Sequence, residues 1–311
     1  MRGRISGQLV GVHVNIAERL SLLRKGAIII VCRALNVPVV LHLHAHFRPF
    51  YRALPHPLQA FVRWIFSLPS CCVVLGNAAQ RFVTEELRVP AERVEIVFNG
   101  VPEPVEIRRK VAANCVRRVL FLGRLSELKG VPDLLRALAL PGFDRLRLEV
   151  TLAGGGDIQA CRAEAEALNI DSFVHFEGWL DQQKVACLMA GADVLVLPSY
   201  VEVLPLAVLE ALANGVAVVC TPVGEIPSVL TDGVNACFVQ PGDVQGLAAS
   251  LQRVLGQPAL MESLERSGRA LYEEKFSLAR FFGAVACIHR RYFGIAGEPL
   301  PATRNIAKNI P

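Results

Sequence analysis

With 311 residues, the chain is long enough for two domains that each bury a core. Hydrophobic residues make up 52% of it and charged residues 20%, a balance that excludes a disordered tail or a fibrous repeat. The net charge is +5, and no apolar run reaches the roughly 18 residues that a membrane-spanning helix needs.

The first 70 residues are basic, because nine of them are Arg or Lys and only Glu18 is acidic. Aromatic residues accompany the cations in the segments 47–52 and 63–66. This pattern predicts an amphipathic surface that contacts anionic lipid or a lipid-linked acceptor, although a solvated basic face is an alternative. The start of the chain lacks a signal-peptide pattern, so we expect a cytoplasmic protein, peripheral on the inner face of the membrane. The nine cations are Arg2, Arg4, Arg19, Arg24, Lys25, Arg33, Arg48, Arg52 and Arg63.

Short β-branched runs alternate with helical stretches along the chain, which is the pattern of parallel sheets with crossover helices. The sequence therefore predicts an α/β fold with two Rossmann-like domains. The front part has predicted strands at 9–15, 37–42, 71–75 and 94–98. The back part has predicted strands at 118–122, 147–153, 173–177, 194–198, 217–221 and 236–239, and helices at 131–139, 158–168, 182–190 and 206–214.

Turn formers and prolines at 99–111 mark the break between the two domains. A doubly wound nucleotide fold opens with a strand and a glycine-rich turn, and no such turn follows the first predicted strand. We therefore expect the front domain to lack its first units. The expected organisation is a partial N-terminal domain at 1–104, a C-terminal domain at 105–275, a helix at 276–295 that packs back on the N-terminal domain, and a frayed tail at 296–311.

The first candidate binding element follows the strand predicted at 118–122. Gly123 and Arg124 come directly after this strand, and Lys129 follows before a helix with Pro132 in its first turn. Two cations at the carboxyl end of a strand suit a diphosphate, because Arg offers a planar fork and Lys a point charge. Taken alone, the segment is also compatible with an ordinary charged surface loop.

The second element follows the strand predicted at 194–198 and contains two carboxylates. Glu202 lies in the loop, Leu204 and Pro205 precede the next helix, and Glu210 lies within that helix among apolar residues. A carboxylate on so apolar a helix is costly to bury without partners, which the hydroxyls of a ribose could supply. The helix start is also a place for an anion. Alternatively, Glu210 reaches solvent or an arginine.

Two further loops, 152–157 with Gly155 and 221–227, also follow predicted strands. Glycines let a backbone approach a ligand closely, although tight turns explain such runs as well. All four elements fall at the carboxyl ends of strands in one sheet, the edge where open α/β sheets bind ligands. We therefore predict a single ligand site at this edge.

Residues 119–242 resemble the family 4 retaining glycosyltransferases, enzymes of the GT-B fold in which two Rossmann-like domains face each other across a cleft. The Gly-Arg-Leu…Lys-Gly element at 123–130 and the Glu-x7-Glu pair at 202–210 carry the likeness. Asn-Gly-Val at 99–101 is similar to the interdomain linker of the family. The resemblance covers nearly the whole chain and is best in the back half.

The resemblance implies a role for each of these residues. Arg124 and Lys129 would hold the donor diphosphate, and Glu210 would bind the ribose hydroxyls. Glu202 would lie beside the donor sugar in a catalytic role, and Trp179 would frame the base. We also expect Gly123, Gly155, Leu204 and Pro205 to contact the donor.

In the front half, the run Val-Val-Leu-His-Leu-His-Ala at 39–45 looks like the family's strand that ends in a histidine at the cleft. His44 matches that histidine, which implies contact with the donor sugar or the acceptor and a catalytic role. His42 and His46 flank it with period two, so one strand face could carry all three. We do not favour a metal site, because neither the seven histidines nor the nine cysteines show ligand spacing. His42 is also compatible with a satisfied core histidine.

Three positions depart from the family pattern. Val203 stands where a small residue is usual after the first Glu, Ser228 replaces a usual glutamate, and Ala236 replaces a usual glycine. The β-branched side chain of Val203 restricts its backbone and crowds the expected sugar position. Nothing before Val10 matches the family's first strand and glycine-rich loop.

We therefore expect a retaining, metal-independent glycosyltransferase of the hexosyltransferase type. It would move a sugar from a nucleoside-diphosphate sugar to a glycan or lipid-linked acceptor, as in cell-surface polysaccharide synthesis. We expect no metal or other cofactor, because the cations would take up the leaving group's charge and the chain has no Asp-x-Asp triplet. We also expect no nucleic-acid partner. The alternative is a truncated, catalytically weak nucleotide-sugar-binding or partner protein, which the short front domain and Val203 favour. A sugar-nucleotide 2-epimerase is a third possibility that the two motifs argue against.

Overall fold

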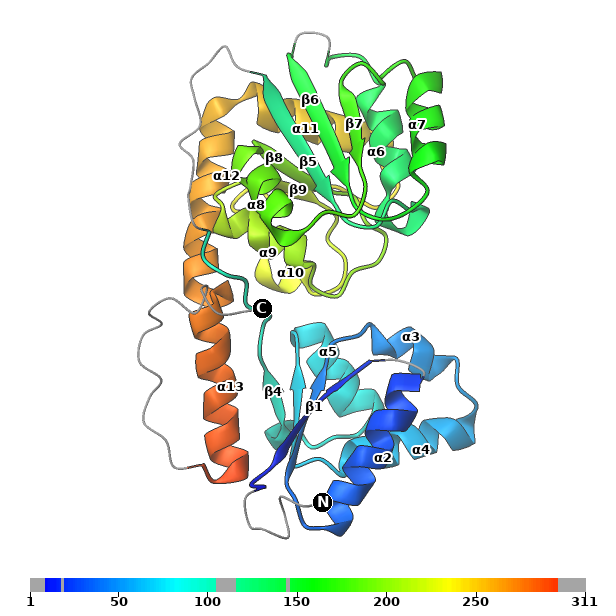
Figure 1. Cartoon of the computed structure of the whole chain (residues 1–311), viewed down its shortest axis with the longest axis vertical. Coiled ribbons are helices and arrows are strands. Elements are labelled where there is room, and N and C mark those ends of the chain that lie inside the picture. The colour runs from blue at the N-terminus through cyan, green and yellow to red at the C-terminus, as the bar shows by residue number, and fades with distance from the viewer. Residues whose placement is uncertain (1–8, 18–19, 105–115, 144–145, 296–311) are drawn as a thin grey trace. The chain divides into compact units, whose positions relative to one another are not determined.

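The computed structural model describes residues 9–17, 20–104, 116–143 and 146–295 (Figure 1). These residues form two compact units: unit 1 holds the described residues up to Gly100 together with those from Leu278, and unit 2 is Val101–Ser277. Each unit has a parallel sheet with covering helices, so the predicted α/β class with two such domains is confirmed. The tail predicted at 296–311 lies outside the described residues, as does most of the predicted linker.

The sheet of unit 1 has the strand order β1-β2-β3-β4, and each neighbouring pair is parallel. Every residue of β2 and β3 is buried, as expected for strands rich in Val, Leu and Cys that are covered on both faces. The four strands lie where the sequence predicted them, to within a few residues. They are β1 (Val12–Ile16), β2 (Val39–Leu43), β3 (Cys71–Val74) and β4 (Val94–Ile96).

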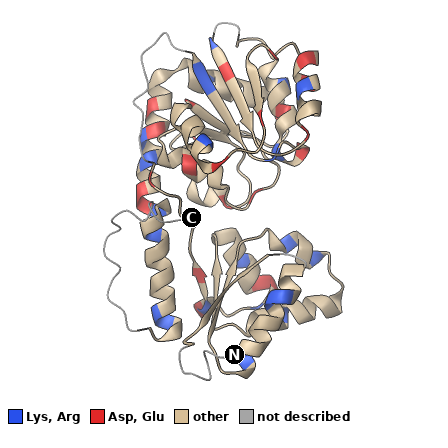
Figure 2. Ribbon diagram, viewed as in Figure 1, with Lys and Arg blue, Asp and Glu red and all other residues tan. Residues whose placement is uncertain are grey.

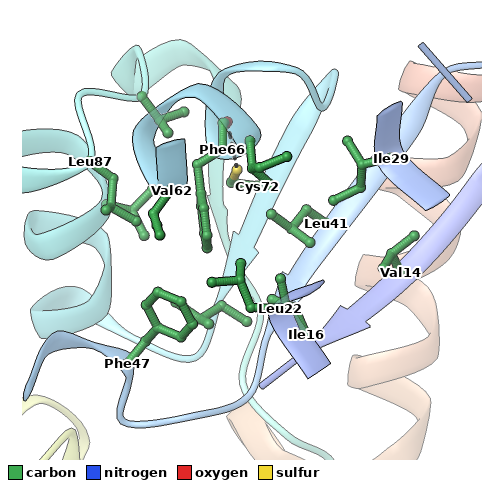
Figure 3. Close-up of a cluster of buried hydrophobic side chains, with 14 of the residues drawn as sticks. Val14, Ile16, Leu22, Ile29, Leu41, Phe47, Val62, Phe66, Cys72 and Leu87 are labelled. Atoms are coloured by element: carbon green, nitrogen blue, oxygen red, sulfur yellow. Dashed lines mark hydrogen bonds between the residues drawn. The ribbon is translucent and has the colours of Figure 1, made fainter. Parts of the chain in front are cut away.

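Different parts of the chain cover the two faces of this sheet. Because side chains alternate along a strand, Leu41 and its neighbours at alternate positions pack in one core with α2, α3 and α4 (Figure 3). On the other face, Val40 packs with Val73 and Ile288, the last of which belongs to α13. The helices of unit 1 are α2 (Leu20–Ala34), α3 (Phe47–Arg52), α4 (His56–Ser67), α5 (Asn77–Arg81) and α13 (Leu278–Phe293).

The aromatic segments 47–52 and 63–66 contribute mainly to the core of unit 1. Phe47, Tyr51, Ile65 and Phe66 are buried, while Trp64 is exposed. Most of the aromatic side chains that the sequence assigned to an outward amphipathic surface are therefore core residues, while the surface itself stays a prediction. The sequence pattern missed their burial because the apolar positions in both segments have the spacing of a helix face, which does not say whether that face turns inward.

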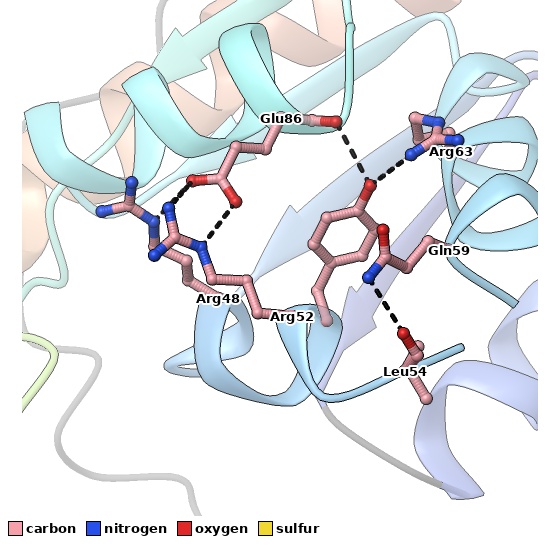
Figure 4. Close-up of polar contacts among 7 residues, drawn as sticks. Arg48, Arg52, Leu54, Gln59, Arg63 and Glu86 are labelled. Atoms are coloured by element: carbon pink, nitrogen blue, oxygen red, sulfur yellow. Dashed lines mark hydrogen bonds and ion pairs between the residues drawn. The ribbon is translucent and has the colours of Figure 1, made fainter. Parts of the chain in front are cut away.

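Two cations of α3 are also engaged within unit 1. Arg48 Nε lies 2.6 Å from a carboxylate oxygen of Glu86, and Arg52 Nε lies 3.0 Å from the other one (Figure 4). The hydroxyl of Tyr51 accepts a hydrogen bond from Arg63 and donates one to the backbone carbonyl of Glu86. Hydrogen bonding to Arg52 and Arg48 lowers the pKa of the Glu86 carboxyl.

The sheet of unit 2 has the order β10-β9-β8-β5-β6-β7, and all its neighbouring pairs are parallel. Its first strand along the chain, β5, lies in the middle, with β6 on one side and β8 on the other. All six strands confirm the sequence prediction. They are β5 (Arg117–Leu122), β6 (Leu148–Ala153), β7 (Val174–Glu177), β8 (Val194–Leu197), β9 (Ala217–Cys220) and β10 (Cys237–Phe238).

Helices connect these strands and pack on one another. α6 contacts α7 and α11, α11 contacts α12, and α12 contacts α9. Three of the helices start at an aspartate whose carboxylate accepts a backbone N–H, the usual device for satisfying the first amides of a helix. The helices are α6 (Val131–Leu138), α7 (Ile158–Ala167), α8 (Gln182–Gly191), α9 (Leu206–Ala213), α10 (Ile226–Val229), α11 (Val244–Gly256) and α12 (Pro258–Leu271).

Candidate functional site

The strand order of unit 2 places a ligand crevice at the carboxyl end of β5. Strand order reverses at β5, since the chain goes from β5 to β6 on one side and later returns to β8 on the other. Loops that leave adjacent strands in opposite directions diverge, and open α/β sheets bind ligands at that point. The loops that meet there are 123–130 after β5, 154–157 after β6 and 198–205 after β8. The predicted donor-binding residues lie in these loops, in α9, and in the loop after β7.

An ion pair bridges the loops after β5 and β8. The ammonium nitrogen of Lys129 lies 2.6 Å from Oε1 of Glu202, and the hydroxyl of Ser199 donates to the same oxygen over 2.8 Å. The Glu202 side chain is 8% exposed and that of Lys129 is 28% exposed. Two residues that the sequence implicated separately, 73 positions apart, are therefore in direct contact. Ser199 was missed because a lone serine after a strand carries no distinctive pattern.

The close approach of these two loops depends on Gly130. Its φ is +69°, and a Cβ added there would lie 2.1 Å from the backbone oxygen of Pro198. Only glycine fits both the left-handed backbone and the contact. The backbone N–H of Tyr200 donates to the carbonyl of Leu128 over 2.9 Å, and the Tyr200 hydroxyl donates to Asp133 over 2.7 Å. The loop that carries Glu202 is thus fastened on both sides of Lys129.

The loop after β6 also approaches the β5 loop at backbone distance. A Cβ at Gly154, whose φ is +147°, would lie 1.9 Å from the carbonyl oxygen of Gly123. Gly155, the residue that the sequence singled out, carries the opposite feature, since nothing lies within 4 Å of an added Cβ there. It faces open space beside the crevice. The close contact between the β6 and β5 loops therefore rests on its neighbour Gly154, and the approach of a ligand to the glycine run stays a prediction.

Arg124 is the exposed cation of the site. It follows Gly123 directly and forms no hydrogen bond or ion pair with any other residue in the described parts of the chain. Lys129 by contrast is paired. One guanidinium is therefore available to a ligand at the carboxyl end of β5, while the ammonium would have to divide its contacts between a ligand and Glu202.

A cavity of about 420 Å³ opens beside Gly123, between the β5 and β6 loops and the helices α8 and α9. Glu210 lines it, and burial raises the pKa of this carboxyl above its ordinary value. Among the described residues, none forms a hydrogen bond or ion pair with the Glu210 carboxylate. A half-buried acid that faces a cavity without a partner can accept hydrogen bonds from a ligand's hydroxyls. The lining residues are Leu122, Gly123, Ala153, Gly154, Trp179, Leu180, Gln182, Val185 and Glu210.

Trp179 stands at the margin of this cavity with 83% of its surface exposed. So large an exposed indole offers an unoccupied aromatic face. α9, which carries Glu210, begins after Pro205, and no side-chain hydrogen bond caps its start among the described residues. Leu204 is buried and anchors this turn. The helix start therefore points unpaired N–H groups outward, which suits an anion.

The loop after β9 forms hydrogen bonds with the turn around Val203. The backbone N–H of Glu225 donates to the carbonyl of Val203 over 2.7 Å, and the hydroxyl of Thr221 donates to the carbonyl of Ser199. Thr221 is fully buried. The fourth predicted loop, 221–227, therefore stabilises the turn that carries Glu202 through these two hydrogen bonds. That contribution is positional, and no local pattern in the sequence indicates it.

Four histidines of unit 1, His13, His42, His44 and His289, form a connected row. β2 ends at Leu43, so of the three histidines predicted for this strand only His42 lies in it, and His46 already precedes α3. This corrects the prediction that one strand face could carry all three. His44 lies directly beyond the strand, is exposed, and has its ring centroid 4.0 Å from that of His42.

His42 continues this row into the core of unit 1. Its Nδ1 lies 3.3 Å from Nε2 of His13, whose Nδ1 lies 2.7 Å from Nε2 of His289 in α13. Burial lowers the pKa of His42 to about 3 and that of His13 to about 4, so both rings are neutral at pH 7. Nε2 of His42 is buried and has no hydrogen-bond partner. The row is thus a neutral core feature beneath His44. No set of three or more potential ligands in the described segments is arranged to hold a metal ion.

Two family models match the chain, one in each half. Residues 106–271 match the model described as Glycosyl transferases group 1, and residues 13–103 match the model described as Glycosyltransferase Family 4. The first match contains Arg124, Lys129, Glu202 and Glu210. The second contains His44.

Similar proteins include an uncharacterised glycosyltransferase of Methanocaldococcus jannaschii, 26% identical over 230 residues that cover 70% of this chain and 59% of that protein. A glycogen synthase of Mycobacterium tuberculosis is 27% identical over 263 residues, which cover 82% of this chain and 63% of that protein. The chain thus spans less than two thirds of these relatives. Among solved structures, the Anabaena protein HepE in complex with UDP and glucose has a TM-score of 0.75 at 19% identity, covering 90% of this chain and 78% of that one. This likeness supports the GT-B fold.

Proposed function

Because the chain belongs to the family of glycosyl transferases group 1, we propose that it transfers a sugar from a nucleoside-diphosphate sugar to a hydroxyl acceptor. One observation carries the proposal. The switch point of the unit 2 sheet gathers the paired ammonium of Lys129 with a guanidinium and an acid that have no partner among the described residues. The acid, Glu210, lines a cavity that Gly123, the neighbour of Arg124, also lines. Cations suit a diphosphate and an acid suits a ribose, and a nucleotide sugar contains both groups.

Arg124, Lys129 and the start of α9 would bind the leaving group. When the sugar departs, negative charge builds on the diphosphate and positive charge on the anomeric carbon. Donors fixed by the β5 loop and the helix start stabilise that negative charge without reorganising. We propose that these groups do so without a metal ion. The site's own cations are the support for this statement.

Glu210 would accept the ribose hydroxyls within the cavity, and Trp179 would lie against the base. Two hydroxyl donors give the half-buried Glu210 carboxylate the partners that the described residues of unit 2 do not supply. The Anabaena neighbour was solved with UDP and glucose, which makes a uridine nucleotide the first donor to test here.

Glu202 would act at the donor sugar. Its carboxylate is buried, oriented by Ser199 and Lys129, and adjacent to the proposed diphosphate site. An anion at that place opposes the positive charge that develops at the anomeric carbon. The family resemblance supports retention of the anomeric configuration. It also assigns His44 to the sugar or the acceptor.

We further propose a hexosyl donor and a glycan or lipid-linked acceptor, as in the synthesis of cell-surface polysaccharide. The basic, apolar front half supports a lipid-linked acceptor and a peripheral contact with the inner face of the membrane, because both bring the protein to an anionic surface.

Calorimetric titration with UDP, GDP and ADP tests the donor site. We expect Arg124→Ala to weaken the binding of the preferred nucleotide by about tenfold or more, since a charge-assisted contact with phosphate is lost. The matched control is Arg118→Ala, at the amino end of the same strand, where the arginine forms only an exposed ion pair with Glu149. Equal affinity in the Arg124 variant and the wild-type chain would overturn the phosphate assignment.

Release of nucleoside diphosphate from the matching sugar nucleotide tests the reaction itself. We expect release that depends on an added membrane extract as acceptor and is lost in Glu202→Gln. Binding without any release would instead support the second candidate, a nucleotide-sugar-binding or partner protein. Val203 favours that candidate, because its side chain occupies the turn that presents Glu202.

A further inference from the structure

The outer face of α2 is apolar, although no described element of unit 1 covers it. The helix buries Leu22, Gly26, Ile29 and Cys32 against the sheet and α4. A surface helix normally turns charged and polar residues to the opposite side. Here the exposed positions of the helix are apolar apart from two arginines, Arg24 and Arg33. The apolar ones are Leu20, Leu23, Ala27, Ile28, Ile30, Val31 and Ala34, and the exposed Leu35 follows directly after the helix.

The exposure of these side chains is large. Leu20 is 80% exposed and Leu23 is 60% exposed, and three residues further along the helix are about two-fifths exposed. Single exposed leucines are common on protein surfaces and need no explanation. A continuous stripe along a whole helix is different, because contiguous exposed apolar surface marks a contact with another molecule or a membrane.

α4 extends the same apolar surface. It packs beside α2 (Figure 1). At this contact the Ile65 side chain lies against Gly26. Its outward residues Leu58, Phe61 and Trp64 are 50%, 39% and 47% exposed, and the rings of the last two lie 5.8 Å apart. Its one arginine, Arg63, donates to Tyr51 within the unit. The α2–α4 face, defined as the outward residues of these two helices, thus combines aliphatic side chains with an aromatic pair.

The charge around this face identifies its occupant. Between Glu18 and Glu85 the sequence contains eight Arg and Lys residues and no acidic residue. Figure 2 shows only basic charged residues on α2 and α4. A second copy of the chain would bring two such positive faces together, which is unfavourable. An anionic surface is complementary to them.

The size of the elements indicates contact with a bilayer surface, without crossing. α2 has 15 residues, which is about 22 Å of helix and shorter than the roughly 30 Å hydrocarbon core of a bilayer. In the parts of the chain that the structure covers, no helix meets the length and hydropathy needed to cross a membrane. Tryptophan beside phenylalanine is typical of the boundary between headgroups and acyl chains. A helix of this kind lies in the plane of the interface.

We propose that the α2–α4 face docks on a bilayer that contains anionic phospholipid. Leu20, Leu23, Val31, Phe61 and Trp64 enter the boundary between headgroups and acyl chains, and Arg24 contacts lipid phosphate. This names the surface for the membrane contact proposed above. It does not depend on sugar transfer or on donor binding.

A single-tryptophan protein gives a direct test. The chain has two tryptophans, so Trp179→Phe leaves Trp64 as the only one. We expect its fluorescence to shift to the blue when vesicles of phosphatidylcholine with phosphatidylglycerol are added, and to stay unchanged with phosphatidylcholine alone. No shift with the anionic vesicles would overturn the proposal, and an equal shift with both kinds would overturn its anionic part.

Vesicle sedimentation with matched variants locates the surface. We expect Leu23→Ser with Phe61→Ala to abolish most binding, and Arg24→Gln to weaken it about fivefold, the usual effect of one cation near an anionic membrane. The controls are Val234→Ser and Arg147→Gln, exposed residues of unit 2 that should leave sedimentation unchanged. Equal losses in the control variants would contradict the assignment to α2 and α4.

Two further measurements separate this proposal from others. Circular dichroism and UDP binding should be unchanged in the surface variants, because the substituted side chains are exposed and lie in unit 1. If the wild-type chain itself does not bind UDP, that result contradicts the proposed function and leaves the lipid proposal standing. If size-exclusion chromatography shows a dimer that Leu23→Ser with Phe61→Ala dissociates, then a second copy covers the face and the lipid proposal is wrong.

Discussion

The ammonium group of Lys129 and the carboxylate of Glu202 lie 2.6 Å apart and tie the loop after β5 to the loop after β8. The pair spans the switch point of the sheet, so it occupies the place where a ligand is expected. A bound diphosphate would compete with Glu202 for the ammonium. The pair thus holds the site together without a ligand and supplies a cation when one arrives.

Lys129→Ala should reduce both stability and nucleotide binding. The Glu202 carboxylate is nearly buried and would keep only its hydrogen bond from Ser199, so we expect a loss of about 1–3 kcal/mol in the free energy of unfolding. Chemical denaturation measures that loss, and calorimetry with UDP measures binding. Lys275→Ala is the control, because Lys275 forms only an exposed pair at 3.9 Å. Unchanged stability would show that the pair is dispensable.

Glu202→Gln separates the two functions of the pair. The amide keeps the hydrogen bond with Ser199 but releases the Lys129 ammonium, so we expect UDP affinity to be equal or higher while release of nucleoside diphosphate falls. Glutamine cannot oppose positive charge at the anomeric carbon as a carboxylate does. Weaker UDP binding in this variant would contradict the competition between Glu202 and a diphosphate.

Gly130→Ala should destabilise unit 2 more than a left-handed alanine alone. The variant must carry both the strain of φ at +69° and a contact with the backbone of Pro198. Gly215→Ala is the matched control, since Gly215 has a φ of +62° but open space around an added Cβ. We expect about 1 kcal/mol of destabilisation in the control and about 3 kcal/mol or more at Gly130. Equal losses at both positions, measured by urea denaturation, would show that the loops can separate at little cost.

The stretches around these residues differ in how well the sequence predicts them. The strands, the helices and the β5 loop follow from local patterns, namely β-branched runs, a glycine with two cations, and a proline at a helix start. The contact between Tyr200 and Asp133 joins residues 67 positions apart, and that between His13 and His289 joins residues 276 apart. No local pattern encodes such partners, because they depend on which strands become neighbours in the sheet.

The α2–α4 face also shows what the sequence could not predict, namely which apolar residues are buried and which are exposed. The basic and aromatic composition indicated an anionic surface, but the aromatic residues chosen for it were largely those that fill the core, such as Phe47 and Phe66. Leu20 and Leu23 look like core residues in the sequence and lie outside. A helix that is apolar all round leaves its inward face undetermined until the sheet is assembled.

Glu210→Gln should stabilise unit 2 at neutral pH. Burial raises the pKa of this carboxyl in the folded chain, so its contribution to stability is full below its unfolded pKa and is lost as the pH rises through the raised folded value. Glutamine removes this dependence. We expect the variant to be more stable than the wild-type chain at pH 8 and to differ little at pH 4, by urea denaturation at both pH values. It should also bind UDP more weakly.

The exposed Glu262 provides the comparison for this prediction, because Glu262→Gln changes a carboxyl that is open to solvent. A stabilisation of the same size in Glu262→Gln would mean that a general charge effect, rather than burial of Glu210, is responsible.

Acid should destabilise unit 1 through the histidine row. The pKa of His42 lies at about 3 and that of His13 at about 4 in the folded chain, below the value of 6.5 for a free histidine. The unfolded chain therefore binds more protons between these values, and stability is present above pH 6.5 and is lost as the pH falls toward 4. Each histidine contributes up to about 1.4 kcal/mol per pH unit in this window.

His13→Gln should make that loss shallower between pH 6.5 and 5, where few carboxylates titrate. The variant removes one of the two rings with the most strongly lowered pKa and also the contact that links His42 to His289. His175→Gln, at an exposed position of unit 2, should keep the wild-type slope. Unfolding free energies from urea denaturation at several pH values give these slopes. A His13→Gln slope equal to that of the wild-type chain would mean that the row is protonated without cost and that its burial does not govern the acid stability of unit 1.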